Sequence, residues 1–157
     1  MAVPMTPDQV RVLPLAELER TYERPAAAPL ALPRGVWQGE FLCYVDAAGA
    51  RRAWVQFLDG LAFERTPFGV DFDTRAWWFF RPDLRIGHFE VSTGPSLWRN
   101  TETLRLRYQR SYLPGFVKRR LYDEIKPLSD SALLGLGGLN QHRGEGDHFF
   151  FLLSKVR

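Results

Sequence analysis

The stretch Glu-Thr-Leu-Arg-Leu-Arg-Tyr-Gln-Arg, residues 102–110, alternates apolar and polar side chains over the length of a β-strand. Leu104, Leu106 and Tyr108 fall on one side of such a strand, and polar side chains such as Gln109 fall on the other. One apolar and one wet side are typical of an antiparallel sheet, and they exclude the doubly covered parallel sheet of α/β enzymes. This stretch therefore predicts an all-β fold.

The chain from Arg34 onward has the composition of further short β-strands. Runs rich in Phe, Trp, Tyr, Val and Leu are separated about every 8–12 residues by Gly, Pro, Asp and Asn, as in sandwiches and barrels. We expect strands at Gly35–Asp46, Arg52–Leu58, Leu61–Arg65, Arg75–Arg81, Ile86–Thr93, Leu97–Asn100, Glu102–Arg110, Val117–Lys126, Ala132–Gly137 and His148–Ser154. A closed sheet avoids exposed edges, so we predict a single antiparallel β-barrel of about 8–10 strands, wide enough for one small ligand.

The first strand is expected to alternate as well. Trp37, Phe41, Cys43 and Val45 would share one face of it, opposite Tyr44 and its polar neighbours. This pattern again predicts one buried and one wet face.

The N-terminal residues differ in composition from the rest, with six prolines and no Gly or Trp before residue 34. A short helix beginning at Pro14 is expected, because proline is tolerated in a first turn and Leu15, Leu18 and Tyr22 would share one side. That apolar stripe would pack the segment on the main body. The predicted organisation is an N-terminal arm with a short helix (1–33) followed by the barrel domain (34–157).

Composition and charge narrow the classes of function. The chain has 157 residues, 14% of them aromatic, which suits one folded domain and argues against disorder, a coiled coil or a small helical bundle. Its formal charge of +3 is small, so no nucleic-acid partner is expected. Between Arg99 and Lys126, however, eight basic residues accompany three acidic ones. We favour a solvated basic wall there over an anionic partner.

The sequence also bears on location. The single cysteine, Cys43, fits a reducing compartment, and the first ten residues lack the pattern of a secretion signal. No apolar run approaches the ~20 residues that span a bilayer. We therefore expect a cytoplasmic protein without a membrane span, and a homodimer is left open.

Metal and cofactor motifs do not stand out. The soft or borderline ligands are His88, His142, His148 and Cys43, without the spacing of a zinc site. The glycine-rich stretch 135–140 lacks the spacing and the following helix of a phosphate loop. We predict no metal and no cofactor.

Two charged residues are candidates for chemistry. If Val117–Lys126 is one strand, Arg119 and Asp123 share the face of Leu121 and Ile125 and point into the interior. A buried charge is costly unless it is paired or used. We favour a structural Arg119–Asp123 pair, with a polar anchor or acid–base group as the alternative.

Large aromatic side chains are the candidates for ligand contact. Several tryptophans are too many for the packed core of a small barrel, so some of them should line a cavity, although each one alone is more typical of a core. The candidate ligand-binding residues are Phe41, Trp54, Trp78, Trp98 and Tyr108.

A family resemblance appears where the short helix is followed by Gly35-Val36-Trp37. This opening, with Lys155 or Arg157 after the last strand, resembles the lipocalin/calycin pattern. The resemblance implies that Trp37 closes one barrel end and that the basic side chain lies across its indole. Gly35-Val36-Trp37-Gln38-Gly39 also resembles the bacterial G-x-W-x-G family of unknown function, and residues 122–125, 134–135 and 149–152 are similar to its partner domain.

The expected function follows from these features together. The leading hypothesis is that the barrel interior holds a small, mostly apolar molecule. The alternative is a small barrel enzyme, of isomerase, cyclase or hydratase type, in which Asp123 and Arg119 take part in the reaction.

Overall fold

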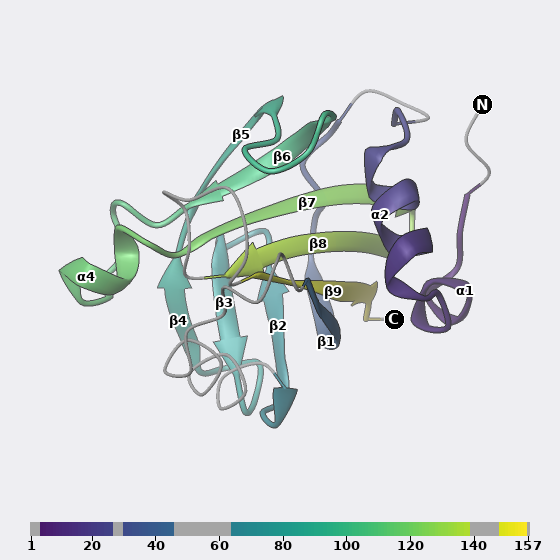
Figure 1. Cartoon of the computed structure of the whole chain (residues 1–157). Helices are drawn as coiled ribbons and strands as arrows, with labels where there is room; N and C mark the ends of the chain where they lie inside the picture. Colours follow the sequence, from purple (N-terminus) through teal and green to yellow (C-terminus); the bar gives the residue numbers. More distant parts are fainter. Residues whose placement is uncertain (1–3, 27–29, 46–63, 139–147, 157) are drawn as a thin grey trace.

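A computed structural model of the chain describes residues 4–26, 30–45, 64–138 and 148–156. The described residues form one nine-stranded antiparallel sheet that curls into a nearly closed barrel, with short N-terminal helices (Figure 1). Its strands are β1 Val36–Val45, β2 Phe68–Asp71, β3 Ala76–Phe79, β4 Arg85–His88, β5 Glu90–Pro95, β6 Glu102–Arg107, β7 Tyr122–Ser129, β8 Ala132–Gly138 and β9 His148–Lys155. The helices are α1 Pro7–Arg11, α2 Leu15–Glu23 and α4 Gly115–Lys118. The predicted single antiparallel barrel is confirmed.

The strands lie in the order β4-β3-β2-β1-β9-β8-β7-β6-β5, so β4 and β5 are the two ends of the sheet. These two strands are consecutive in the chain and are separated by one residue, Phe89, which is 4% exposed. One bent segment therefore supplies both ends and brings them together. The expected strand Ile86–Thr93 is this segment, interrupted at Phe89.

Most expected strands are present, with a few corrections. β1, β8 and β9 match their predicted bounds to within one residue at each end. β2 was not predicted, and residues 97–100 form bends instead of a strand. The expected strand at 52–58 and residues 61–63 of the next one lie outside the described residues.

The expected strand Val117–Lys126 is wrong in its first half. Pro114 caps the short helix α4, and Arg119 follows at its C-terminal end, so β7 begins only at Tyr122. Proline cannot donate a backbone hydrogen bond and suits the start of a helix. Asp123 and Ile125 still share the inner face of β7, as predicted, because alternation holds within the part that is a strand.

The alternation predicted for β1 is also interrupted. The register with β9 shifts between Phe41 and Cys43, which marks a β-bulge. Phe41 and Tyr44 both pack on the inner cluster, whereas Cys43 and Val45 belong to the outer one. The bulge therefore exchanges the faces that a strict alternation assigns to Cys43, Tyr44 and Val45.

Two apolar clusters lie on opposite faces of the central strands. Successive residues of β9 alternate between them, with Phe149 and Phe151 inside and Phe150 outside. The outer cluster is covered by α2, whose Leu18 and Tyr22 are buried. Figure 1 shows α1 and α2 beside the ends of β7 and β8. The expectation of one wet face is therefore wrong for this part of the barrel, because the N-terminal arm covers it.

The arm packs through the predicted helix. Pro14 is the N-cap of α2, and Leu18 and Tyr22 are at most 1% exposed, although Leu15 remains 36% exposed. The preceding helix α1, which was not predicted, begins with a capping box between Thr6 and Gln9.

Candidate functional site

A chain of three polar side chains crosses the apolar interior of the barrel. Asp123 comes from β7, Tyr108 follows β6 directly, and Trp77 comes from β3. Trp77 Nε1 donates to Tyr108 Oη at 2.5 Å, and Tyr108 Oη donates to Asp123 Oδ2. All three residues are at most 4% exposed. The Trp77–Tyr108 bond thus joins β3 to the end of β6, which is far from it in the sheet order, and the Tyr108–Asp123 bond joins the neighbouring strands β6 and β7.

The electrostatic state of Asp123 is set by its burial. Loss of water raises the pKa of this carboxyl from 3.8 to about 7; the hydrogen bond from Tyr108 opposes the rise and the charge of Glu124 adds to it. Burial and the nearby Asp123 charge also raise the pKa of Tyr108 well above its usual value. Near neutral pH, Asp123 therefore exists both as acid and as carboxylate.

Glycines on β8 make room for these inner side chains. A methyl group on Gly137 would overlap Asp123 Oδ1, and one on Gly135 would overlap the ring of Phe151. Gly137 is paired directly with Asp123 across the β7–β8 ladder. The carboxyl thus occupies the space that a side chain at position 137 would otherwise fill.

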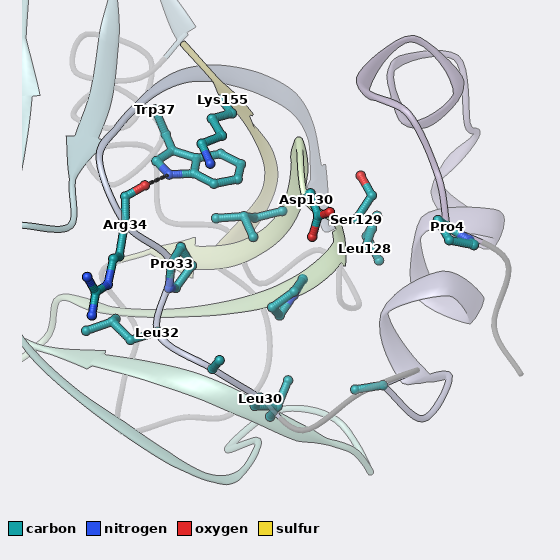
Figure 2. A pocket seen from close by; sticks show the side chains of 14 residues that line it. Pro4, Leu30, Leu32, Pro33, Arg34, Trp37, Leu128, Ser129, Asp130 and Lys155 are labelled. Carbon is teal, nitrogen blue, oxygen red and sulfur yellow. Dashed lines mark hydrogen bonds between the residues drawn. The ribbon is translucent and has the colours of Figure 1, made fainter. Parts of the chain in front are cut away.

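Trp37 lies near one end of the barrel, at the start of β1. Its ring is 2% exposed, and its Nε1 donates to the backbone oxygen of Arg34 at 3.0 Å. Lys155 Nζ stands 5.9 Å from the centroid of the ring. Figure 2 shows the side chain of Lys155 beside the indole of Trp37. The predicted cation–π contact of a basic C-terminal residue with Trp37 is confirmed for Lys155, and Arg157 lies outside the described residues.

At this end lies a pocket of about 540 Å³, bordered by Leu30, Leu32, Pro33, Leu128 and Lys155 (Figure 2). Residues 30–33 form one of its walls. The indole of Trp37 separates this pocket from the inner cluster, since Trp37 contributes to both.

The opposite end of the barrel is lined by half-buried apolar side chains. This is the end where β1 finishes and β7 begins. Phe41 and Tyr44 on β1, Val91 on β5, and Leu113 and Leu121 beside α4 are partly buried against the inner cluster. Asp123 therefore lies near this end, away from Trp37.

The structure separates the predicted ligand-contact residues. Tyr108 and Phe41 belong to the inner cluster or pack on it. Trp78 is buried on the other side of β3 against Gly69, and Trp98 packs at 5.1 Å on Tyr122 in the outer cluster. Trp54 lies outside the described residues. Phe41 and Tyr108 are thus the described members of the set that face the interior.

The predicted pair of Arg119 and Asp123 does not form. Arg119 is exposed at the C-terminal end of α4, whereas Asp123 is 2% exposed inside the barrel. Within the described part of the chain, Tyr108 is the hydrogen-bond donor to Asp123, and none of the ion pairs involves this carboxyl. The helix at 115–118 is the reason, because it removes Arg119 from the strand.

Sequence reasoning missed two members of the polar interior and its surroundings. Trp77 and Trp78 are adjacent and lie on opposite faces of one strand. The sequence alone does not show which of the two faces the interior, so Trp77 was not identified. Glu124 was expected on a wet face, yet it is fully buried under the arm. The apolar stripe of α2 was the available signal that some outer face had to be covered.

Glu124 is held by four donors. Tyr122 Oη at 2.8 Å and the Leu97 backbone N–H at 2.6 Å bind one carboxyl oxygen. Tyr22 Oη at 3.0 Å and Ser96 Oγ at 2.5 Å bind the other. Because these donors come from α2, β7 and the loop after β5, the carboxyl connects the arm to the barrel wall.

Lys126 fastens the same arm. Its Nζ donates to the backbone oxygens of Tyr22 at 2.6 Å and Arg24 at 2.5 Å, and to the hydroxyl of Thr101. Burial lowers the pKa of this amine to about 8. Arg99 adds a two-point ion pair with Glu19 of α2, at 2.6 and 2.7 Å. Two of the basic residues expected on an open wall thus hold the arm instead.

The described residues contain no group of three or more His, Cys, Asp or Glu side chains arranged to hold a metal ion. None of the helices described is both long and apolar enough to cross a membrane.

Comparison with known proteins supports the fold. No protein-family model matches the chain, and no curated protein matches its sequence. Among solved structures, a protein from Thermomonospora curvata is similar in fold, with a TM-score of 0.51 and 20% sequence identity over 92% of this chain and 89% of that one. At this identity the likeness concerns the fold alone.

Proposed function

We propose that the protein binds a small, mostly apolar molecule inside the barrel, with a polar group of that molecule against Asp123 and Tyr108. The observation that carries the proposal is a carboxyl that is 2% exposed, lies among aromatic side chains and has Tyr108 as its donor in the described part of the chain. Burying such a group is costly unless it serves a purpose. As an acid, Asp123 can donate a hydrogen bond to a ligand carbonyl or hydroxyl.

Two further observations support an interior site of the lipocalin kind. Trp37 and Lys155 make the contact that the lipocalin resemblance implies at a closed barrel end. At the other end, four partly buried side chains offer an apolar surface along which a ligand could enter; they are Phe41, Tyr44, Leu113 and Leu121.

The second candidate is an enzyme acting on an apolar substrate, favoured by the pKa of about 7 for Asp123. An isomerase needs only a group that accepts a proton from one substrate atom and returns it to another. Asp123 would take the proton as carboxylate and give it back as acid, so that no proton is consumed. Tyr108, instead of the exposed Arg119, would steady the carboxylate.

Native mass spectrometry and fluorescent-dye titration test the binding proposal. The full chain should carry a bound small molecule or take up the uncharged dye N-phenylnaphthylamine, and apolar alcohols and ketones should displace the dye. Asp123→Asn and Tyr108→Phe should weaken displacement by polar-tipped competitors about tenfold, the loss of one good hydrogen bond.

The matched control is Tyr122→Phe, which removes a buried tyrosine hydroxyl on the outer side of the same wall. It should leave dye binding unchanged. The absence of both a bound species and dye uptake, or equal weakening by Tyr108→Phe and Tyr122→Phe, would contradict an interior site at Asp123. Turnover of a substrate lost only in Asp123→Asn would favour the enzyme.

A further inference from the structure

Residues 109–120, within the connection from β6 to β7, form a projecting loop that is called the α4 loop below. Figure 1 shows α4 extending beyond the barrel wall, away from α1 and α2. The segment contains four basic residues and no acidic one. They are Arg110, Lys118, Arg119 and Arg120.

Two aromatic side chains are exposed on the α4 loop. Tyr112 is fully exposed and Phe116 is 57% exposed. Scattered exposed apolar groups are ordinary, but two aromatic rings among four cations in one projecting loop form a combined apolar and basic surface. Tyrosine and phenylalanine flanked by basic residues are suited to the interface between water and lipid.

The α4 loop is anchored at its base. Leu113 packs on the inner cluster, and Ser111 Oγ donates to the Tyr108 backbone oxygen at 2.7 Å. Lys118 Nζ donates to the Ser111 backbone oxygen at 3.4 Å. These contacts hold the turn in one conformation. Leu113 packs inward from it, whereas Tyr112 and Phe116 stay at the surface.

The basic residues of the α4 loop differ in whether they form ion pairs. Arg110 forms an ion pair with Glu90 at 3.0 Å, whereas the salt bridges among the described residues include neither Arg119 nor Lys118. Arg119 and Arg120 are both exposed at the end of α4. A planar guanidinium recognises phosphate and carboxylate groups well.

We propose that the α4 loop docks the protein on an anionic lipid surface, with Tyr112 and Phe116 entering the headgroup region and Arg119 and Arg120 contacting lipid phosphates. A convex tip with exposed rings suits insertion into a bilayer better than it suits the flat surface of an acidic protein. Leu113 of the loop and the adjoining Leu121 pack on the inner cluster, so docking would bring the apolar interior of the barrel close to the lipid. The docking depends only on surface residues, so it stands apart from the proposed interior ligand.

Vesicle sedimentation tests the proposal with the full chain. We expect binding to vesicles of phosphatidylcholine and phosphatidylserine, little binding to phosphatidylcholine alone, and weakening with added salt. Arg119→Gln with Arg120→Gln should weaken partition roughly 25-fold, because each cation near an anionic surface contributes about fivefold. Tyr112→Ser with Phe116→Ser, which keeps every charge, should weaken it about tenfold.

The matched control is Arg20→Gln with Arg81→Gln, which removes the same charge from exposed positions on α2 and in the β3–β4 turn. It should weaken partition no more than about twofold, through net charge alone. Circular dichroism and thermal unfolding of each variant check that the fold is retained, as expected for exposed positions.

Three results would overturn the proposal. They are no binding of the unaltered chain to phosphatidylserine vesicles, equal loss in the two arginine pairs, and no loss on removal of Tyr112 and Phe116. Binding of RNA or polyglutamate through Arg119 and Arg120 without vesicle binding would point to a different partner. Dye uptake in solution tests the interior site separately, and Tyr112→Ser with Phe116→Ser should leave it intact.

Discussion

Asp123 and Glu124 are neighbouring carboxyl groups on β7, and both are buried, yet their surroundings are opposite. Glu124 on the outer face receives four hydrogen bonds from three parts of the chain. Among the described residues, Asp123 on the inner face has one donor, Tyr108, and it lies among aromatic side chains. Both carboxyls are at most 2% exposed, so the difference lies in hydrogen-bond donors instead of access to water.

The difference separates a structural carboxyl from a functional one. Four donors can replace the water that Glu124 loses, so its burial joins the arm to the barrel. One donor cannot do the same for Asp123, and its pKa rises to about 7 as a result. Groups used in binding or catalysis are often kept at a cost to stability.

Removing the outer carboxyl should have the largest effect. Glu124→Ala leaves four buried donors facing a small cavity, and we expect a loss of about 3–5 kcal/mol in the free energy of unfolding. Denaturant unfolding measures it. A loss below about 1 kcal/mol would mean that water replaces the carboxyl, and the contrast with Asp123 would then fail.

Neutralising the inner carboxyl should have the opposite sign. The pKa of Asp123 is raised in the folded chain, so folding favours the protonated carboxyl. Its contribution to the free energy of unfolding is complete below the ordinary value of 3.8 and is lost as pH rises through about 7. An asparagine at this position does not ionise, so Asp123→Asn avoids this loss of stability. We expect the variant to be about 2–4 kcal/mol more stable than the unaltered chain at about pH 8, and nearly equal to it at about pH 4.

Unfolding curves at both pH values give that difference directly. Because the other titrating groups are common to both proteins, their effects cancel in the comparison. A variant that is less stable than the unaltered chain at about pH 8 would show that the Asp123 charge is needed by the fold.

How far could the sequence predict this arrangement? The inner direction of Asp123 followed from its spacing to Ile125, and Trp37 with Lys155 followed from the opening motif and the last strand. Glu124 did not follow, because alternation along a strand shows two faces but not which partner covers the second one. The packing of α2, through residues about a hundred positions away in sequence, and of the loop after β5 makes that face buried.

The alternation of apolar and polar residues also could not predict where strands are interrupted. The helix α4 follows Pro114 and extends into the run Val117–Lys126, which alternates as a strand would. The bulge after Phe41 leaves no polar residue to mark it. β2 is four residues long and contains Gly69, which strands usually disfavour. Gly69 is tolerated because the ring of Trp78 occupies the space above it.

Two matched tyrosine variants refine the comparison. Tyr108→Phe removes the donor to Asp123 and the acceptor of the Trp77 N–H, and we expect a loss of about 2 kcal/mol at neutral pH. It should also raise the pKa of Asp123 further, since that hydrogen bond lowers it. NMR titration of the side-chain carboxyl carbon would detect the shift, and an unchanged pKa would contradict the hydrogen bond.

The smallest effect is expected from Tyr122→Phe. Glu124 keeps three donors, and the Leu97 N–H still binds the same oxygen that Tyr122 leaves. We expect a loss of about 1 kcal/mol, measured by denaturant unfolding. A loss larger than that of Tyr108→Phe would reverse the order and show that Glu124 depends on each donor singly.

The space shared by Asp123 and Gly137 has a consequence for ancestry. Because the carboxyl fills the volume of a missing side chain, position 137 cannot gain a side chain while Asp123 stays as it is. Descendants that enlarge residue 137 should have shortened or lost the acid at 123, and those that keep the acid should keep the glycine across the ladder. This two-position rule would recognise distant kin that retain the buried acid, even where overall identity has faded.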